Sequence, residues 1–145
     1  MSPVESAAMW SLYARSAEAI AIQSTFSKLF DCLPENYYVG MVKYIDYKTD
    51  VIQSSNRFHP YLHKRRSYQH EHELRVMHPQ APSDGFERET PEGIWVPVNL
   101  AHLISTVYVS PNSRPWFRDL VKSVSNKYGL DRSVVQSDLD TTPVF

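Results

Sequence analysis

Most of the ionisable chemistry of this chain is concentrated in residues 64–78, Lys-Arg-Arg-Ser-Tyr-Gln-His-Glu-His-Glu-Leu-Arg-Val-Met-His. If this stretch is extended, its side chains alternate between two faces, so that Glu71, Glu73 and Arg75 share one of them. Two carboxylates on one face need cations or strong hydrogen-bond donors beside them. Arg75 and Lys64 supply such cations. The sequence therefore predicts a polar centre at this Glu-x-Glu-x-Arg segment.

The N-terminal segment offers further partners for these carboxylates. Arg15 brings a guanidinium, Trp10 an indole N–H and Tyr13 a phenol within a few residues. Residues three apart on a helix share a face, so Trp10 and Tyr13 can reach the same place. We therefore expect these side chains to lie beside the polar centre although they are distant from it in sequence.

Other patterns in the chain favour different chemistry. His70 and His72 alternate onto one face and, with His78, His59 or His63, suit a zinc or iron site. Asp46 with Glu71 or Glu73 would suit Mg²⁺ in a nuclease, although such sites usually place a lysine where this chain has Arg75. His70 and His72 share their face with apolar residues, which favours an ordinary exposed strand end, and we expect no metal.

Composition limits the classes of partner. The formal net charge is −1 and the sequence pI is about 6.6, so no global field favours nucleic acid or an anionic membrane. The basic and aromatic residues of segment 57–68 could contact phosphates and bases, but acids follow them at once. Cys32 is the one cysteine, no apolar run could span a bilayer, and Glu5 interrupts any signal-peptide pattern. We expect a cytoplasmic protein whose partner is a small molecule or another protein.

The elements that must position the polar centre form one α+β domain over residues 1–145, with a mixed sheet of about five or six short strands flanked by helices. Residues 37–47 and 71–78 are expected to be the central strands. Further strands are expected at 20–22, 94–98, 106–109 and 133–137. Residues 79–92 are rich in Pro, Gly and charge, which predicts a mobile loop.

The helices are expected at 4–16, at 26–33 and at 100–104, with a last amphipathic helix that begins near Pro115. Ser2 is expected to cap the first, Ser24 or Thr25 the second, and Ser113 the last. Gly129 is the expected left-handed stop of the last helix.

Several segments, taken in order, resemble a bacterial domain-of-unknown-function family, family 2971. They are Trp10-Ser11-Leu12-Tyr13, Val42-Lys43-Tyr44, Lys64 with Tyr68, Glu71-x-Glu73-x-Arg75, Leu103-Ile104 and Ser110-Pro111. Members of that family usually have a substantial segment before the Trp-Ser-x-Tyr helix. This chain is therefore expected to be either a short variant or the C-terminal part of the family domain, and the resemblance implies no activity.

A second resemblance concerns the carboxylate pair. Glu71-x-Glu73, preceded by Ser24-Thr25, is similar to the layout of Arg-Ser-Glu ADP-ribosyltransferases. That resemblance implies that Glu73 is catalytic and Glu71 orients the acceptor. It also implies that Ser24 and Thr25 brace Glu73, that Arg15 binds phosphate, and that NAD is the cofactor. Arg15 lies only nine residues before Ser24, closer than that pattern expects.

The alternative is a non-enzymatic binding or scaffold module in which the same charges form a structural ion-pair network. Partly buried networks of this kind fix geometry more than they add stability. The two interpretations differ in what they predict for Glu73→Gln. If the carboxylate is structural its loss destabilises the fold, and if it is kept for catalysis its loss leaves stability nearly unchanged.

Overall fold

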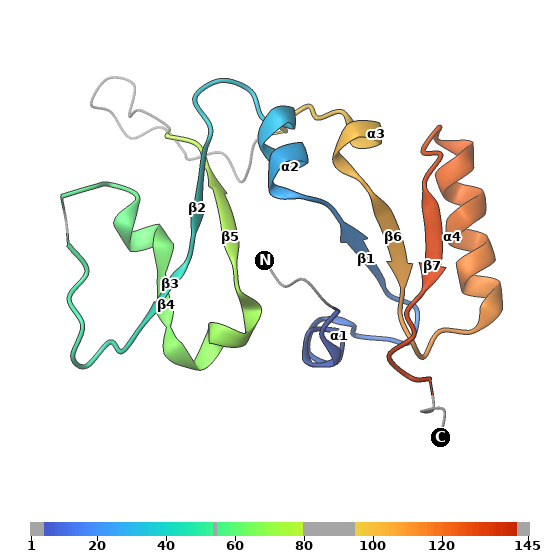
Figure 1. Ribbon diagram of the computed structural model, residues 1–145, viewed down its shortest axis with the longest axis horizontal. Helices are drawn as coiled ribbons and strands as arrows, with labels where there is room; N and C mark the ends of the chain where they lie inside the picture. The colour runs from blue at the N-terminus through green and yellow to red at the C-terminus, as the bar shows by residue number, and fades with distance from the viewer. Residues whose placement is uncertain (1–4, 54, 80–94, 142–145) are drawn as a thin grey trace. The chain divides into compact units, whose positions relative to one another are not determined.

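The computed structural model describes residues 5–53, 55–79 and 95–141. The chain divides into two compact units. The central unit is formed by the described residues within Pro34–Val96, and the terminal unit by those within Val4–Leu33 and Pro97–Phe145. Figure 1 shows the elements of each unit.

The terminal unit contains a mixed three-stranded sheet in the order β1-β6-β7. Strand β1 (Ile20–Gln23) runs antiparallel to β6 (Thr106–Val109), and β6 runs parallel to β7 (Ser133–Gln136). Inward-facing residues alternate along the central strand β6, so that Val107 and Val109 are buried. Most of the apolar core of this unit lies on β6 and at the residue that ends the helix before it, Ile104.

Four helices complete the terminal unit: α1 (Ala7–Tyr13), α2 (Phe26–Cys32), α3 (Leu100–Leu103) and α4 (Pro115–Lys127). Helices α2 and α3 begin as predicted, since the side chains of Thr25 and Asn99 accept hydrogen bonds from the third residue of each helix. Helix α1 is shorter than predicted and is capped by Ser6. Gly129 ends the last helix at a φ of 75°, as expected.

Helix α4 begins differently from the prediction. Pro115 occupies its first turn, but the residue before it is Arg114 and no side chain caps this end. Ser113 is buried instead, and its hydroxyl donates to the carbonyl of Ser110 at 2.9 Å. The side-chain amide of Gln136 on β7 also donates to that carbonyl, at 2.8 Å. Ser113 therefore holds the turn between β6 and α4, because a buried hydroxyl needs a partner more than an exposed helix end needs a cap.

The central unit contains two small sheets. Strand β2 (Tyr38–Met41) pairs antiparallel with β5 (Leu74–Met77), and β3 (Lys43–Ile45) pairs parallel with β4 (His63–Arg65). Two 3-10 helices, η1 (His59–Leu62) and η2 (Arg66–Glu71), flank β4 in the sequence.

The α+β class is confirmed, but the described strands form a mixed sheet of three and two sheets of two. The predicted strand 37–47 is divided at Val42, where the chain leaves β5 and pairs with β4 instead. Residues 95–98 form no strand, and Pro97 there has no N–H to donate to a ladder. The predicted mobile loop 79–92 lies outside the described residues except for Pro79. In the described part of the chain, no helix has the length and apolarity that crossing a membrane requires.

Gly40 on β2 lets η1 lie against the β2–β5 pair. A Cβ atom at Gly40 would lie 2.8 and 2.9 Å from the two methyl carbons of Leu62, the last residue of η1. Gly40 is also directly opposite Arg75 in the register of the two strands. The absence of a side chain at this position therefore sets how closely η1 approaches Arg75.

We predict that Gly40→Ala lowers the free energy of unfolding by about 1–3 kcal/mol, because Leu62 must shift to admit the added methyl group. Chemical denaturation measures this cost. Its origin is tested by repeating the substitution in a Leu62→Ala background, where most of the cost should disappear. An equal cost in both backgrounds would contradict the close contact with Leu62.

Candidate functional site

The polar centre predicted from the sequence is present within the central unit. Lys64 on β4 lies between the two carboxylates, and its ammonium group donates to Glu71 Oε2 and, at 3.2 Å, to Glu73 Oε2. The same ammonium group lies 4.7 Å from the ring centre of Tyr68. Lys64 thus joins two carboxylates from a neighbouring segment and is attracted by an aromatic face as well.

Arg75 on β5 binds Glu73 through a two-pronged contact. Its Nε donates to Glu73 Oε1 at 2.6 Å and its Nη2 donates to Glu73 Oε2 at 3.1 Å. The remaining nitrogen, Nη1, donates to the backbone carbonyl of Tyr61 in η1. This fork geometry is the strong form of an ion pair, because two parallel charge-assisted bonds fix both groups. Arg75 therefore links β5 to Glu73 and to η1.

The backbone of Glu73 is held as firmly as its side chain. Its N–H donates to the hydroxyl of Tyr44 at 2.8 Å, and its carbonyl accepts from the N–H of Val42 at 2.9 Å. Tyr44 is paired with Lys64 in the β3–β4 ladder. Residues of β3, β4 and β5 thus converge on Glu73, and the two small sheets of the central unit meet there.

The extended geometry predicted for residues 71–73 is wrong, although the two carboxylates do meet the same cation. Glu71 ends the 3-10 helix η2, and His72 has left-handed backbone angles, with φ 44° and ψ 48°. A β-strand begins only at Leu74. This turn at His72 brings the carboxylates of Glu71 and Glu73 to one ammonium group. The sequence analysis predicted this meeting from the alternation of side chains along a strand, but residues 71–73 do not form a strand.

Burial and charge define the electrostatics of the site. The side chain of Glu71 is 8% exposed, whereas those of Glu73, Lys64 and Arg75 are between 25% and 31% exposed. The two cations and two carboxylates sum to zero charge. The bond from Arg75, and then that from Lys64, holds the pKa of Glu73 below its ordinary 4.5. The bonds to these carboxylates raise the pKa of Lys64 and of Arg75. Glu73, Lys64 and Arg75 are therefore charged at neutral pH.

The N-terminal residues predicted to join the polar centre belong to the terminal unit, where several have local partners. Trp10 Nε1 donates to Glu5 Oε1 at 3.2 Å, and Ser24 Oγ donates to the carbonyl of Leu103 at 2.6 Å. Thr25 caps α2. Tyr13 and Arg15 are exposed. That these residues lie beside Glu71 and Glu73 stays a prediction.

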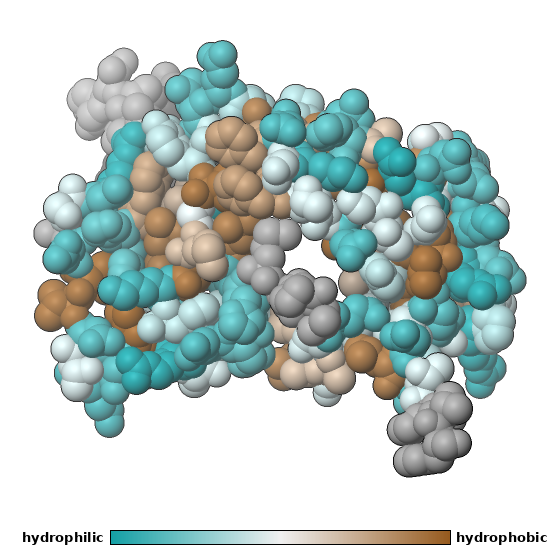
Figure 2. Space-filling model, viewed as in Figure 1, coloured by the Kyte–Doolittle hydropathy of each residue, from teal (hydrophilic) through white to brown (hydrophobic). Residues whose placement is uncertain are grey.

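A pocket of the central unit, which we call the β5 pocket, contains residues that the sequence analysis did not place in the predicted polar centre. It has a volume of about 830 Å³ and is lined by residues of strand β5 and of the segment 57–61. Arg75 lines it together with Arg57, Phe58 and Tyr61. Apolar side chains also reach the surface, as the brown groups in Figure 2 show, and Tyr61 is 63% exposed. The sequence shows that residues 57–61 include basic and aromatic side chains, but it does not show that they line a pocket together with β5.

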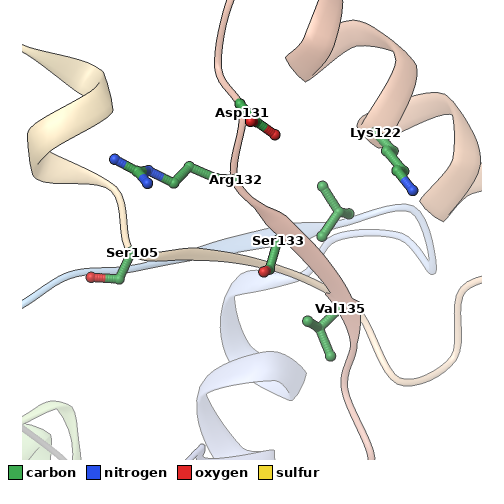
Figure 3. Close-up of a pocket in the computed structure, with 7 residues that line it drawn as sticks. Ser105, Lys122, Asp131, Arg132, Ser133 and Val135 are labelled. Carbon is green, nitrogen blue, oxygen red and sulfur yellow. The ribbon is translucent and has the colours of Figure 1, made fainter.

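A second, open pocket of about 550 Å³ lies in the terminal unit at the start of β7. Its charged residues are Lys122, Asp131 and Arg132. Figure 3 shows that Lys122 and Arg132 point in different directions from the two sides of β7. Arg132 also donates to the carbonyl of Ala101, and Lys28 donates to Ser105, another residue of the pocket lining, at 2.8 Å. The polar groups of this pocket therefore do not converge on one point.

Within residues 5–53, 55–79 and 95–141, no group of three or more His, Cys, Asp or Glu side chains is placed to hold a metal ion. Comparisons of the chain with protein-family models, with curated proteins and with solved structures found no match. The resemblance to family 2971 therefore stays a prediction that depends on the order of its short motifs.

We predict a pH dependence from the lowered pKa of Glu73. A carboxyl group whose pKa is lower in the folded state stabilises the fold above its unfolded pKa, near 4.5, and this contribution is lost as the pH falls through the lowered folded value. The difference in unfolding free energy between the wild type and Glu73→Gln should thus be largest above pH 4.5 and should shrink in stronger acid. Urea titrations from pH 3 to pH 7 measure it. A difference that is constant over this range would contradict the ionised pair.

The left-handed turn gives a second prediction. A non-glycine residue in this conformation costs about 1–2 kcal/mol, so His72→Gly should raise the free energy of unfolding by up to about 1 kcal/mol and His72→Val should lower it. His70, in η2, is the matched control. His70→Gly should lower stability, because glycine there only adds freedom to the unfolded chain. The same sign of change at both positions would show that the turn is not left-handed.

Proposed function

We propose that this chain is a non-enzymatic binding module, in which Lys64, Glu71, Glu73 and Arg75 form an internal ion-pair network that fixes Arg75 at the wall of the β5 pocket. One observation carries the proposal. Arg75 lines the pocket, whereas neither Glu71 nor Glu73 is among the described residues that line it. The carboxylates therefore hold the guanidinium of Arg75, the proposed binding group, without lining the pocket themselves.

The contacts of Glu73 support this structural role. Its two carboxylate oxygens accept three charge-assisted bonds, two from Arg75 and one from Lys64. A carboxylate that stabilises a cationic transition state must present an oxygen to the substrate instead. Glu71 is nearly buried and shares the same ammonium group.

The remaining capacity of Arg75 supports a binding role. A guanidinium has five N–H donors, and the described residues accept three bonds from this one. Glu73 and the carbonyl of Tyr61 hold its plane in place. A guanidinium that is already oriented loses little further freedom when it binds an anion, which favours affinity.

A second candidate is the ADP-ribosyltransferase-like reaction, with NAD as cofactor. The specific observation in its favour is the lowered pKa of Glu73, because a carboxylate that stabilises an oxocarbenium-like transition state must be ionised. On this reading Glu73 is catalytic and Glu71 orients the acceptor. Ser24 and Thr25, which that reading needs as braces, have the structural bonds described above within the terminal unit.

We predict that Glu73→Gln lowers the free energy of unfolding by about 2 kcal/mol, because it leaves two cations with one carboxylate in a partly buried site. Chemical denaturation measures this. Asp119→Asn is a matched control, since the ion pair of Asp119 with Arg118, at 3.4 Å, lies on an exposed helix face and its loss should change stability little.

The wild type and Glu73→Gln also separate the two candidate functions. Release of nicotinamide from NAD is measured for the wild type and for Glu73→Gln. The binding-module proposal predicts no turnover by either protein and a loss of stability in the variant. Turnover by the wild type that Glu73→Gln abolishes, with stability unchanged, would overturn it in favour of the transferase.

A further inference from the structure

The β5 pocket is lined by two kinds of side chain. Arg57 and Arg75 carry guanidinium groups. Phe58 and Tyr61, from the same segment as Arg57, carry aromatic rings. Its volume, about 830 Å³, falls within the range of small-molecule sites.

The charge of this pocket is positive. The charge of Arg75 is balanced by Glu73, but Arg57 forms no ion pair with any described residue, and its one described interaction is with the ring of Phe58, 5.5 Å away. No Asp or Glu is among the described residues that line the pocket. The pocket can therefore accept a ligand with an anionic group, because the charge of Arg57 would attract it and Arg75 has N–H groups left to donate.

The aromatic side of the pocket can accept a flat ring. Tyr61 is 63% exposed, so much of its surface is open to a ligand. Phe58 is already covered, since it packs on Tyr38 with ring centres 5.0 Å apart and lies beneath Arg57. Tyr61 is therefore the more open of the two rings, and its backbone carbonyl accepts a hydrogen bond from the guanidinium of Arg75.

We propose that the β5 pocket binds a small ligand that joins a flat aromatic ring to a phosphate group, the chemistry of a mononucleotide. The ring stacks on Tyr61 and the phosphate is held by Arg57 and Arg75. This inference rests on the proposed binding function, whose network orients Arg75. It adds the class of the ligand and the residues that distinguish that ligand from others.

Three probes test the two halves of the ligand in calorimetric titrations of the full chain. Adenosine monophosphate carries a ring and a phosphate, adenosine carries only the ring, and ribose 5-phosphate carries only the phosphate. We expect the monophosphate to bind at least tenfold more tightly than either of the others. Equal affinity for adenosine would overturn phosphate recognition, equal affinity for ribose 5-phosphate would overturn stacking, and binding of none of them would overturn the ligand class.

Variants locate the binding. Arg57→Gln should weaken adenosine monophosphate about tenfold and leave adenosine unchanged, whereas Tyr61→Ala should weaken it by a similar factor and leave ribose 5-phosphate unchanged. If Tyr61→Ala does not fold, Tyr61→Leu replaces it, because the carbonyl that Arg75 uses is part of the backbone. The matched control is Arg66→Gln, which removes an exposed guanidinium of the central unit outside the pocket. Equal losses at Arg57 and Arg66 would indicate unspecific attraction and would contradict the site.

Failure of the ligand proposal can be distinguished from failure of the proposed function. If Glu73→Gln destabilises the chain and NAD is not consumed, but no probe binds, the ion-pair network stands and the ligand class is wrong. If adenosine monophosphate binds through Arg57 and Tyr61 but Glu73→Gln leaves stability and affinity unchanged, the pocket stands and the role of the network is wrong.

Discussion

The sharing of one ammonium group by two carboxylates is the constraint on which the central unit depends. Lys64 meets both Glu71 and Glu73, and this contact offsets the repulsion between two carboxylates in a partly buried environment. Two like charges that are close together raise the free energy of the fold unless a cation lies between them. With Lys64 in place, and with Arg75 on the outer side of Glu73, the cluster is neutral and the strands that bear it are held together.

This constraint explains features of the backbone that are costly by themselves. The left-handed conformation of His72 is unfavourable for a residue with a side chain, yet it is what allows Glu71 and Glu73 to point to the same place. The division of the chain at Val42 has the same origin, because the N–H of Val42 pairs with the carbonyl of Glu73 while the next residues pair with β4. The break between β2 and β3 at Val42 and the left-handed turn at His72 are therefore parts of one arrangement around Glu73.

The sequence alone indicated which residues form the cluster, since Glu-x-Glu-x-Arg with an upstream lysine combines opposite charges that must meet. It also indicated the starts of α2 and α3, because Thr25 and Asn99 are local caps whose effect depends on three neighbouring residues. It could not indicate the left-handed turn at His72, which brings Glu71 and Glu73 to the distant Lys64, nor the packing of Leu62 in η1 against Gly40 on β2. Features that depend on a few neighbouring residues could be predicted from the sequence, and features that depend on long-range contacts could not. The same limit applies to Ser113, whose role comes from Gln136 on a later strand.

The central claim is that the Glu73–Arg75 pair is a structural bond that fixes the guanidinium. A double-mutant cycle of unfolding free energies tests it most directly, with Glu73→Gln, Arg75→Met and the double variant measured against the wild type at pH 7. The account predicts a favourable coupling of about 1 kcal/mol or more, because the contact is two-pronged and partly buried. Additive effects of the two substitutions, with no coupling between them, would contradict it.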